Sequence, residues 1–274
     1  MTADRAAWRA RLPGVLRDVE RRWSLTLGAP VEAGACGSSW VAPVACAGGT
    51  AAVLKIAMPH MEGEHEIAGL RFWDGDPTVR LLEADEALGA MLLERCDPGA
   101  PLGRAPEAEQ DHVIARLLRR LWRLPAPPHP FRPLSAMIAS WIAETRDQID
   151  RAPDGGLVHE GLRAFGELIR TSSRDALLET DLHAGNALRA QREEWLVIDP
   201  KPFVGDPAYD ATQHLLNCAA RVRMDPDGTI GRFADLLEVD RERVRSWTFA
   251  RAAAAPRGDW RNDPWHALAR VLAP

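Results

Sequence analysis

The spacing of apolar residues divides the chain into two parts with different secondary structure. In the first part, apolar positions at helical spacing over residues 3–23 are interrupted by Pro13 and Gly14, which predicts a broken helix. Short β-prone runs follow at 40–44, 51–56, 79–82 and 90–94, with an amphipathic helix at 61–73 between the two strand pairs. This order predicts a small α+β lobe that ends near Glu94.

The second part is mainly helical. Residues 107–122 have apolar side chains at 113, 114, 117, 118 and 121, the pattern of a helix with one buried face. Further helices are expected at 134–150, 157–171, 207–223, 230–237, 240–254 and 263–272, and a β-hairpin with strands 187–190 and 195–198. We therefore expect two lobes, residues 1–95 and residues 96–274.

Composition excludes some classes of protein. The net charge of −5 and the lack of a dense Lys/Arg run argue against a nucleic-acid-binding protein. The cysteines, Cys36, Cys46, Cys96 and Cys218, form no C-x-x-C pair and no zinc spacing, which is typical of reduced thiols. The N-terminus has no apolar signal region, and no apolar run reaches the roughly 18 residues of a membrane span. We expect a cytoplasmic protein that does not bind membranes.

Three polar residues have the spacing of a phosphoryl-transfer site. Asp181 and Asn186 lie in Asp-Leu-His-Ala-Gly-Asn, and Asp199 ends the apolar run of residues 196–198. In such a site Asp181 orients a hydroxyl nucleophile and accepts its proton, while Asn186 and Asp199 hold Mg²⁺ against the phosphates of ATP. The alternative is that they are ordinary turn residues. The hairpin favours the first interpretation, because it returns Asn186 and Asp199 to the same end of a ribbon.

A second group of candidates lies in the first lobe. Lys55 is flanked by apolar residues on a predicted strand, and it follows a small-residue turn, so it is a candidate for binding the α- and β-phosphates. In that turn Gly34, Gly37 and Ser38 would let backbone N–H groups and a hydroxyl approach the nucleotide, although such turns are more often simple loops. Among Glu62, Glu64 and Glu66, Glu66 is chosen as the partner of Lys55 because it neighbours the core-facing Ile67. The alternative is that these carboxylates only solvate the helix.

Other catalytic chemistries are less consistent with the sequence. No G-x-S-x-G motif is present, which argues against a covalent hydrolase. His183 and His214 have no suitably spaced second ligand, which favours structural or substrate-contact roles over metal binding.

The combined motifs resemble the aminoglycoside phosphotransferases of the protein-kinase-like superfamily, with closer similarity to the streptomycin 6-phosphotransferase and hydroxyurea kinase branch. The most specific segment is Ile-Asp-Pro-Lys-Pro-Phe-Val-Gly-Asp-Pro-Ala-Tyr-Asp, residues 198–210. The resemblance implies a bilobal α+β fold: a small N-terminal antiparallel sheet lobe with one main helix binds ATP, and a larger helical lobe binds the acceptor. It also implies that the backbone near Glu94 and Cys96 holds adenine, and that Asp206 and Asp210 are structural.

The activity implied by the resemblance is ATP- and Mg²⁺-dependent phosphorylation of a small cationic antibiotic, streptomycin or a related aminoglycoside, by a monomer or weak dimer. One feature departs from the family, which usually has His-Gly directly before the catalytic Asp, where this chain has Glu179-Thr180. Either the loop is held differently or catalysis is altered, since Gly permits a backbone geometry that Thr resists. The alternatives are a kinase of an endogenous metabolite or of a hydroxyurea-like compound, and a nucleotide-binding pseudokinase that acts as an interaction module.

Overall fold

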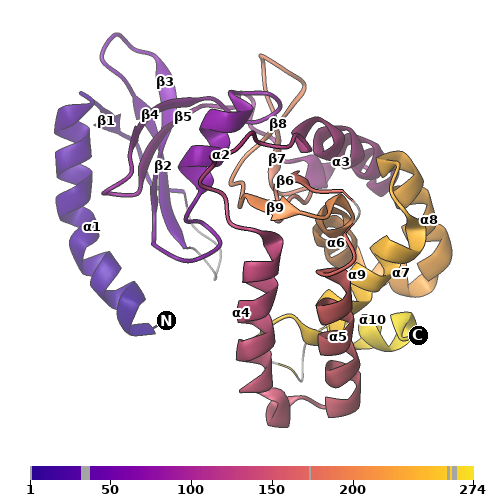
Figure 1. Ribbon diagram of the computed structural model, residues 1–274. Coiled ribbons are helices and arrows are strands. Elements are labelled where there is room, and N and C mark those ends of the chain that lie inside the picture. The colour runs from indigo at the N-terminus through magenta and orange to yellow at the C-terminus, as the bar shows by residue number, and fades with distance from the viewer. Residues whose placement is uncertain (1, 32–37, 173, 258–259, 261–263) are drawn as a thin grey trace. The chain divides into compact units, whose positions relative to one another are not determined.

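The computed structural model describes residues 2–31, 38–172, 174–257, 260 and 264–274. Within these residues the chain forms two compact units (Figure 1). Unit 1 contains residues 1–100 together with 188–198, and unit 2 contains residues 101–187 and 199–274. The expected functional lobes of residues 1–95 and 96–274 stay a prediction, since these units are defined by packing alone.

Unit 1 is built on an antiparallel sheet. Its strands lie in the order β1-β2-β3-β5-β4. They are β1 (Thr26–Leu27), β2 (Ser39–Ala45), β3 (Ala51–Ala57), β4 (Leu81–Asp85) and β5 (Ala90–Glu94). In the register of this sheet Lys55 lies between Val41 of β2 and Met91 of β5. Lys55 is therefore on the central strand. The β4 strand begins two residues later than predicted.

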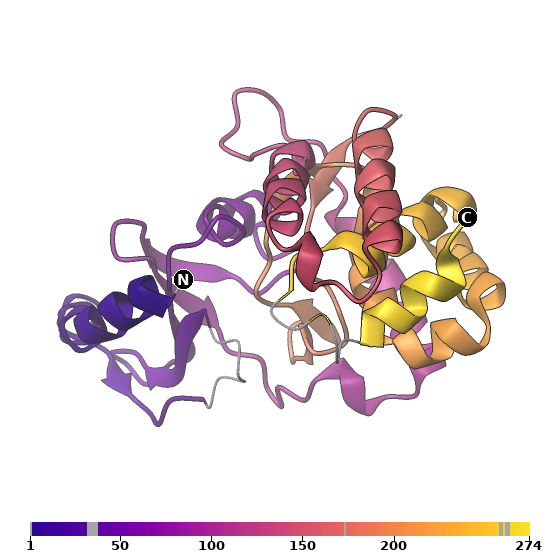
Figure 2. The same cartoon turned by 90° about the horizontal axis from the view of Figure 1, so that it is seen from below.

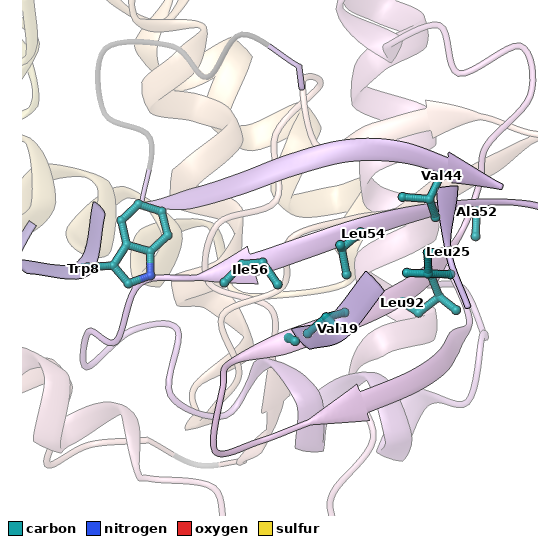
Figure 3. Packing of buried hydrophobic residues seen from close by; sticks show 9 residues of the cluster. Trp8, Val19, Leu25, Val44, Ala52, Leu54, Ile56 and Leu92 are labelled. Atoms are coloured by element: carbon teal, nitrogen blue, oxygen red, sulfur yellow. The ribbon is translucent and has the colours of Figure 1, made fainter. Parts of the chain in front are cut away.

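The long helix α1 (Thr2–Arg22) packs against this sheet. Its Trp8 and Val19 are buried, and they form one cluster with apolar side chains of β2, β3 and β5 (Figure 3). The strand residues of this cluster include Val44, Leu54, Ile56 and Leu92. Burial of this apolar surface, and not helix propensity alone, holds α1 in place.

The break predicted at Pro13 in α1 is wrong, because the helix continues through it. A proline inside a helix leaves the carbonyl four residues earlier without its N–H donor. That carbonyl belongs to Arg9, and both Arg9 and Pro13 lie on the exposed side of α1. Water can therefore solvate the orphaned carbonyl, while packing on the opposite side preserves the helix.

The second helix of unit 1, α2 (Glu66–Trp73), begins five residues later than predicted. Residues 61–65 form turns instead, and the Glu66 N–H is bonded to the carbonyl of Gly63. Glycine is a poor helix former, which is consistent with the late start. Leu70 of α2 then packs with Val79, Met91 and Leu93, and with Leu196 from the hairpin.

The predicted hairpin is confirmed as β7 (Ala187–Arg189) paired with β8 (Trp195–Val197). Backbone hydrogen bonds join β8 to the segment before β4: Val79 N–H donates to the Val197 carbonyl and Val197 N–H to the Pro77 carbonyl, both at 3.0 Å. Residues 188–198 therefore belong to unit 1 although they lie far from it in sequence.

Unit 2 is mainly helical. Its helices are α3 (Glu107–Leu121), α4 (Leu134–Arg146), α5 (Gly155–Leu168), α6 (Pro207–Asn217), α7 (Ala219–Met224), α8 (Pro226–Leu237), α9 (Arg241–Ala254) and α10 (Pro264–Leu272), with 3₁₀ turns η1 (Leu102–Arg104) and η2 (Ile149–Arg151). The C-terminal helix α10 packs beside α7 and α9 (Figure 2). The helix predicted at 207–223 is in fact two, α6 and α7, separated at Cys218.

A short antiparallel pair, β6 (Ala176–Leu178) with β9 (Phe203–Gly205), was not predicted. Leu178 pairs with Phe203, so the residues after β6 and those before β9 lie side by side. This pairing positions the loop that contains Asp181. Among the described helices, none has both the length and the apolar character to span a bilayer.

Close contact between α5 and α9 depends on Gly161. A Cβ added at this position would lie 2.7 Å from the Ala253 Cβ and 2.9 Å from the Ala254 Cβ. We expect Gly161→Ala to lower the free energy of unfolding by about 1–3 kcal/mol, because two helices must separate. Gly166→Ala is the matched control on the same helix, since no atom of the described residues lies within 4 Å of its added Cβ. Urea denaturation of both variants checks this, and equal stability would contradict close packing at Gly161.

Candidate active site

Lys55 and Glu66 form a buried ion pair in unit 1. The Lys55 Nζ lies 2.5 Å from the Glu66 Oε1, and the two side chains are 7% and 4% exposed. The lysine comes from the central strand β3, and the glutamate is the first residue of α2. The predicted partner of Lys55 is therefore confirmed as a contact. A buried ammonium in contact with a carboxylate keeps its orientation and its charge, which suits a group that binds phosphate.

Of the three candidates in the small-residue turn before β2, only Ser38 is among the described residues. Gly34 and Gly37 lie outside the described residues. Ser38 is half-buried, and its carbonyl accepts the Met58 N–H at 2.7 Å, which ties the start of β2 to the end of β3. The proposed contact of this turn with nucleotide phosphates stays a prediction.

The end of β5 is fixed by an arginine from the hairpin, a residue that the sequence did not single out. Arg192 donates through Nε and Nη2 to both oxygens of Glu94, each at 2.9 Å, and Nη2 also donates to the Thr78 carbonyl. Burial alone would raise the pKa of Glu94, but these bonds and the Arg80 N–H lower it. The Glu94 side chain is thus engaged in a structural bond, while a role of the Glu94 and Cys96 backbone in holding adenine stays a prediction.

Cys96 itself is not a reactive thiol. Burial, followed by the negative charge of Glu94, raises its pKa to about 11. A thiol with such a pKa stays protonated at neutral pH, and only the thiolate is a good nucleophile. Any role of Cys96 at the nucleotide would therefore be through its backbone.

In unit 2, the pairing of β6 with β9 brings Lys201 to Asp181. Asp181 follows β6 by three residues and Lys201 precedes β9 by two. The Lys201 Nζ contacts the Asp181 Oδ2, and the two side chains are 17% and 22% exposed. Burial alone would lower the pKa of Lys201, but the Asp181 and Asp199 carboxylates raise it. Lys201 is therefore a cation that holds the carboxylate of the candidate base.

Sequence reasoning did not assign Lys201 to the site. The available signal was its position: it stands two residues after Asp199, and it is the only lysine besides Lys55. Without the β6–β9 pair, nothing in the sequence brings it next to Asp181.

The backbone that presents Asp181 is braced by Asp210 of α6. The Asp210 Oδ1 accepts the Thr180 N–H at 2.8 Å, and its Oδ2 accepts the Glu179 N–H at 3.0 Å and the Trp122 Nε1–H at 2.9 Å. Burial raises the pKa of Asp210 to about 6, although these hydrogen bonds lower it. The structural role expected of Asp210 is thus borne out. Asp206 serves as the N-cap of α6, accepting the Ala208 N–H at 3.0 Å.

Thr180 adopts the left-handed backbone conformation that sequence reasoning considered difficult for it. Its φ is +63°, a value that favours glycine. Besides the bond from its N–H to Asp210, its Oγ1 donates to the Lys201 carbonyl at 2.6 Å, and the Lys201 N–H donates to the Glu179 carbonyl at 2.9 Å. The loop is therefore held by a hydrogen-bond network, and this resolves how Thr fits at this position.

Asn186 and Asp199 flank the two strands of the hairpin, as predicted. The Asn186 Nδ2 donates to the Asp181 carbonyl at 3.1 Å, so a ligand role, which stays a prediction, would fall to the side-chain oxygen. Asp199 has φ +55°. One amide oxygen and one carboxylate fit Mg²⁺, which takes few protein ligands and completes its shell with phosphate oxygens and water. Within the described residues, no cluster of three or more His, Cys, Asp or Glu is arranged to hold a metal.

The two histidines have structural contacts. The Gly185 N–H donates to the His183 Nδ1 at 3.0 Å, and burial lowers the pKa of His183. His214 is fully buried, and its Nε2 lies 2.7 Å from the Asp111 Oδ1. Arg221 also binds Asp111, with both contacts at 2.7 Å. Structural or substrate-contact roles were predicted for both histidines, and these contacts are consistent with the structural alternative.

Comparison with known proteins identifies the family of this chain. The profile of the family described as "Aminoglycoside/hydroxyurea antibiotic resistance kinase" matches residues 22–262. Streptomycin 6-kinase of Streptomyces griseus is 38% identical over 255 residues, which cover 89% of this chain and 82% of the relative. Hydroxyurea phosphotransferase of Kitasatospora aureofaciens is 38% identical over 250 residues, covering 88% and 71%.

Solved structures show the same fold at low sequence identity. Choline kinase LicA of Streptococcus pneumoniae superposes with a TM-score of 0.69 at 13% identity, covering 96% of this chain and 99% of LicA. A second structure of LicA is a complex with AMP, with a TM-score of 0.66. The predicted α+β, protein-kinase-like fold is therefore confirmed. On the extent of the profile match and the identity to these relatives, the chain belongs to the aminoglycoside/hydroxyurea antibiotic resistance kinase family.

Proposed function

We propose that this protein transfers the γ-phosphoryl group of ATP to a hydroxyl of streptomycin or a related aminoglycoside and so inactivates the antibiotic. The observation that carries the proposal is the loop around Asp181. Its carboxylate is held by Lys201, its backbone is braced through Asp210, and Asn186 is bonded to its carbonyl. A fixed carboxylate beside two Mg²⁺-type ligands is the arrangement that orients a hydroxyl for phosphoryl transfer.

Each residue has a definite task in this reaction. Lys55, oriented by Glu66, would bind the α- and β-phosphates. Asn186 and Asp199 would hold Mg²⁺, which supplies positive charge to the phosphate oxygens. Asp181 would orient the acceptor hydroxyl and accept its proton as the oxygen attacks. Catalysis would rest on positioning and on neutralisation of charge, without a phosphoenzyme.

Lys201 places a positive charge beside the loop that contains Asp181. Its ammonium contacts the Asp181 Oδ2, so it restricts the carboxylate to one orientation. The other oxygen, Oδ1, is then the one that would face the acceptor hydroxyl. Asp181 and Asp199 raise the pKa of Lys201, so its ammonium stays charged across the pH range in which the enzyme would work.

A second acceptor is supported by the comparisons. The relative that is a hydroxyurea phosphotransferase is as similar to this chain as the relative that is a streptomycin 6-kinase, at 38% identity each. Hydroxyurea is small and neutral, and it offers a hydroxyl on nitrogen. Overall similarity alone therefore does not separate the two acceptors, and the choice depends on the residues that contact the acceptor.

An acceptor panel tests the proposal. Purified protein with Mg·ATP is incubated with streptomycin, other aminoglycosides and hydroxyurea, and the products are read by mass spectrometry. We expect streptomycin to gain one phosphoryl group and to have the highest kcat/KM in the panel. Phosphorylation of hydroxyurea alone would assign the second acceptor. Binding of Mg·ATP without phosphorylation of any acceptor would favour a nucleotide-binding module.

A further inference from the structure

Glu179 is a fully buried carboxyl group directly beside the candidate base. It follows β6, and its side chain is 0% exposed. Its Oε2 accepts the backbone N–H of Asp181 at 2.6 Å. Its Oε1 is buried and has no hydrogen-bond partner among the residues that the structure describes. Hydrogen bonds donated to a carboxylate favour its ionised form, and the Glu179 side chain accepts one such bond from the described residues.

The charges that face Glu179 come from three segments of unit 2. Asp181 lies on the same loop, Asp210 on α6 and Lys201 just before β9. Among the described residues of unit 2, the ammonium of Lys201 contacts Asp181 rather than Glu179. An ionised Glu179 would thus be a third negative charge beside Asp181 and Asp210. The Lys201 ammonium would not neutralise it directly, because that ammonium contacts Asp181. Burial first, and then the charges of Asp181 and Asp210, raise the pKa of Glu179 well above its ordinary value.

We propose that Glu179 is a positioning residue that works as an uncharged carboxylic acid, holding the Asp181 backbone through Oε2. This inference rests on the proposed function, because it concerns how Glu179 positions Asp181, the proposed base. In the neutral form the Asp181 N–H keeps its acceptor and no third charge faces the site. When Glu179 loses its proton, repulsion between carboxylates displaces the loop, and transfer slows.

The first experiment measures protonation without activity. Unfolding free energies are determined by urea denaturation from pH 5 upward for wild type, Glu179→Gln and Glu160→Gln, an exposed glutamate on α5 that serves as the control. The native state of wild type retains the Glu179 proton above the ordinary pKa of 4.5, whereas the unfolded chain loses it. The stability of wild type is therefore expected to fall relative to Glu179→Gln as the pH rises, until the folded pKa is passed.

The Glu160→Gln control and a possible parallel result for Glu179→Gln determine how this experiment is interpreted. The Glu160→Gln variant should run parallel to wild type over this range. Parallel curves for wild type and Glu179→Gln would show that Glu179 titrates normally and would overturn the inference. This result is independent of any acceptor, so it separates failure of the inference from failure of the proposed function, which the acceptor panel decides.

The second experiment uses the pH profile of kcat. At the acidic end, Glu179→Gln should match wild type within about twofold, because the amide oxygen still accepts the Asp181 N–H. On the alkaline side the kcat of wild type should fall by about tenfold per pH unit, and that of the Gln variant should not. Glu179→Leu, which has no acceptor, should lose roughly tenfold to a hundredfold at every pH. A shared alkaline decline, or a Gln variant as impaired as the Leu variant, would contradict the inference.

Discussion

Replacement of Asp181 with asparagine is expected to lower the kcat of phosphoryl transfer by about 10²- to 10⁴-fold. Asparagine keeps the shape of the side chain, but it cannot accept the proton of the acceptor hydroxyl. It also leaves the Lys201 ammonium without the carboxylate that it contacts. Binding of Mg·ATP should stay within about twofold of wild type, because a residue that acts only on the transferred proton contributes little to ground-state binding. Steady-state kinetics and titration with Mg·ATP check both parts.

The matched control for Asp181→Asn is Asp227→Asn, at a carboxylate on α8 that is 93% exposed. This change also removes one negative charge, and it should leave kcat unaltered. If Asp181→Asn retained near-normal turnover, Asp181 would not be the base. If both kcat and ATP binding were lost, the residue would be needed for the fold of the loop instead.

Replacement of Glu66 with alanine is expected to lower the free energy of unfolding by about 3–5 kcal/mol, because it removes a buried carboxylate that contacts the buried Lys55 ammonium. The pair is enclosed on β3 and α2, and the lysine has little access to water that would solvate its charge. ATP affinity should fall as well, since Lys55 loses the carboxylate that orients it. Glu64→Ala, at an exposed carboxylate two residues earlier, should do neither.

A double variant separates the two effects of this pair. Lys55→Met combined with Glu66→Leu replaces two buried charges with apolar side chains of similar size, and it should recover most of the lost stability. It should not recover ATP binding, because no cation is left to meet the phosphates. Denaturation and nucleotide titration of wild type, Lys55→Met, Glu66→Leu and the double variant form a complete double-mutant cycle. Recovery of ATP binding in the double variant would refute the role of Lys55.

Elements with a strong local pattern were predictable from the sequence. The strand at 90–94 was predicted with its observed bounds, and the hairpin at 187–198 was predicted because apolar runs flank a polar turn. The choice of Glu66 over its neighbours was correct for a local reason as well, because it stands next to core-facing Ile67 and is buried with the helix.

Features that depend on distant partners were not predictable. The strands β6 and β9 have three residues each, which is too short to show alternation, and they exist because they pair across 25 residues of sequence. Lys201 was missed for the same reason, since only this pairing brings it to Asp181. The start of α2 and the continuity of α1 through Pro13 were likewise decided by turns, solvent and tertiary packing.

The Glu179-Thr180 pair, which replaces the usual His-Gly of the family, is accommodated by hydrogen bonds from neighbouring segments. Sequence reasoning noted that Thr resists the backbone geometry needed before Asp181. The structure places Thr180 in that geometry and holds it with Asp210 and the Lys201 carbonyl. The partners in this network, the Lys201 carbonyl and the Asp210 side chain, lie 21 and 30 residues away, so no local pattern reveals it.

The central claim is that the γ-phosphoryl group passes from ATP to a hydroxyl of a small antibiotic. The most direct test follows wild type with Mg·ATP and streptomycin by phosphorus NMR. The proposed function predicts a new phosphomonoester resonance that grows in step with ADP and is absent with Asp181→Asn. Formation of ADP with only inorganic phosphate, or no reaction with streptomycin while ATP binds, would contradict it.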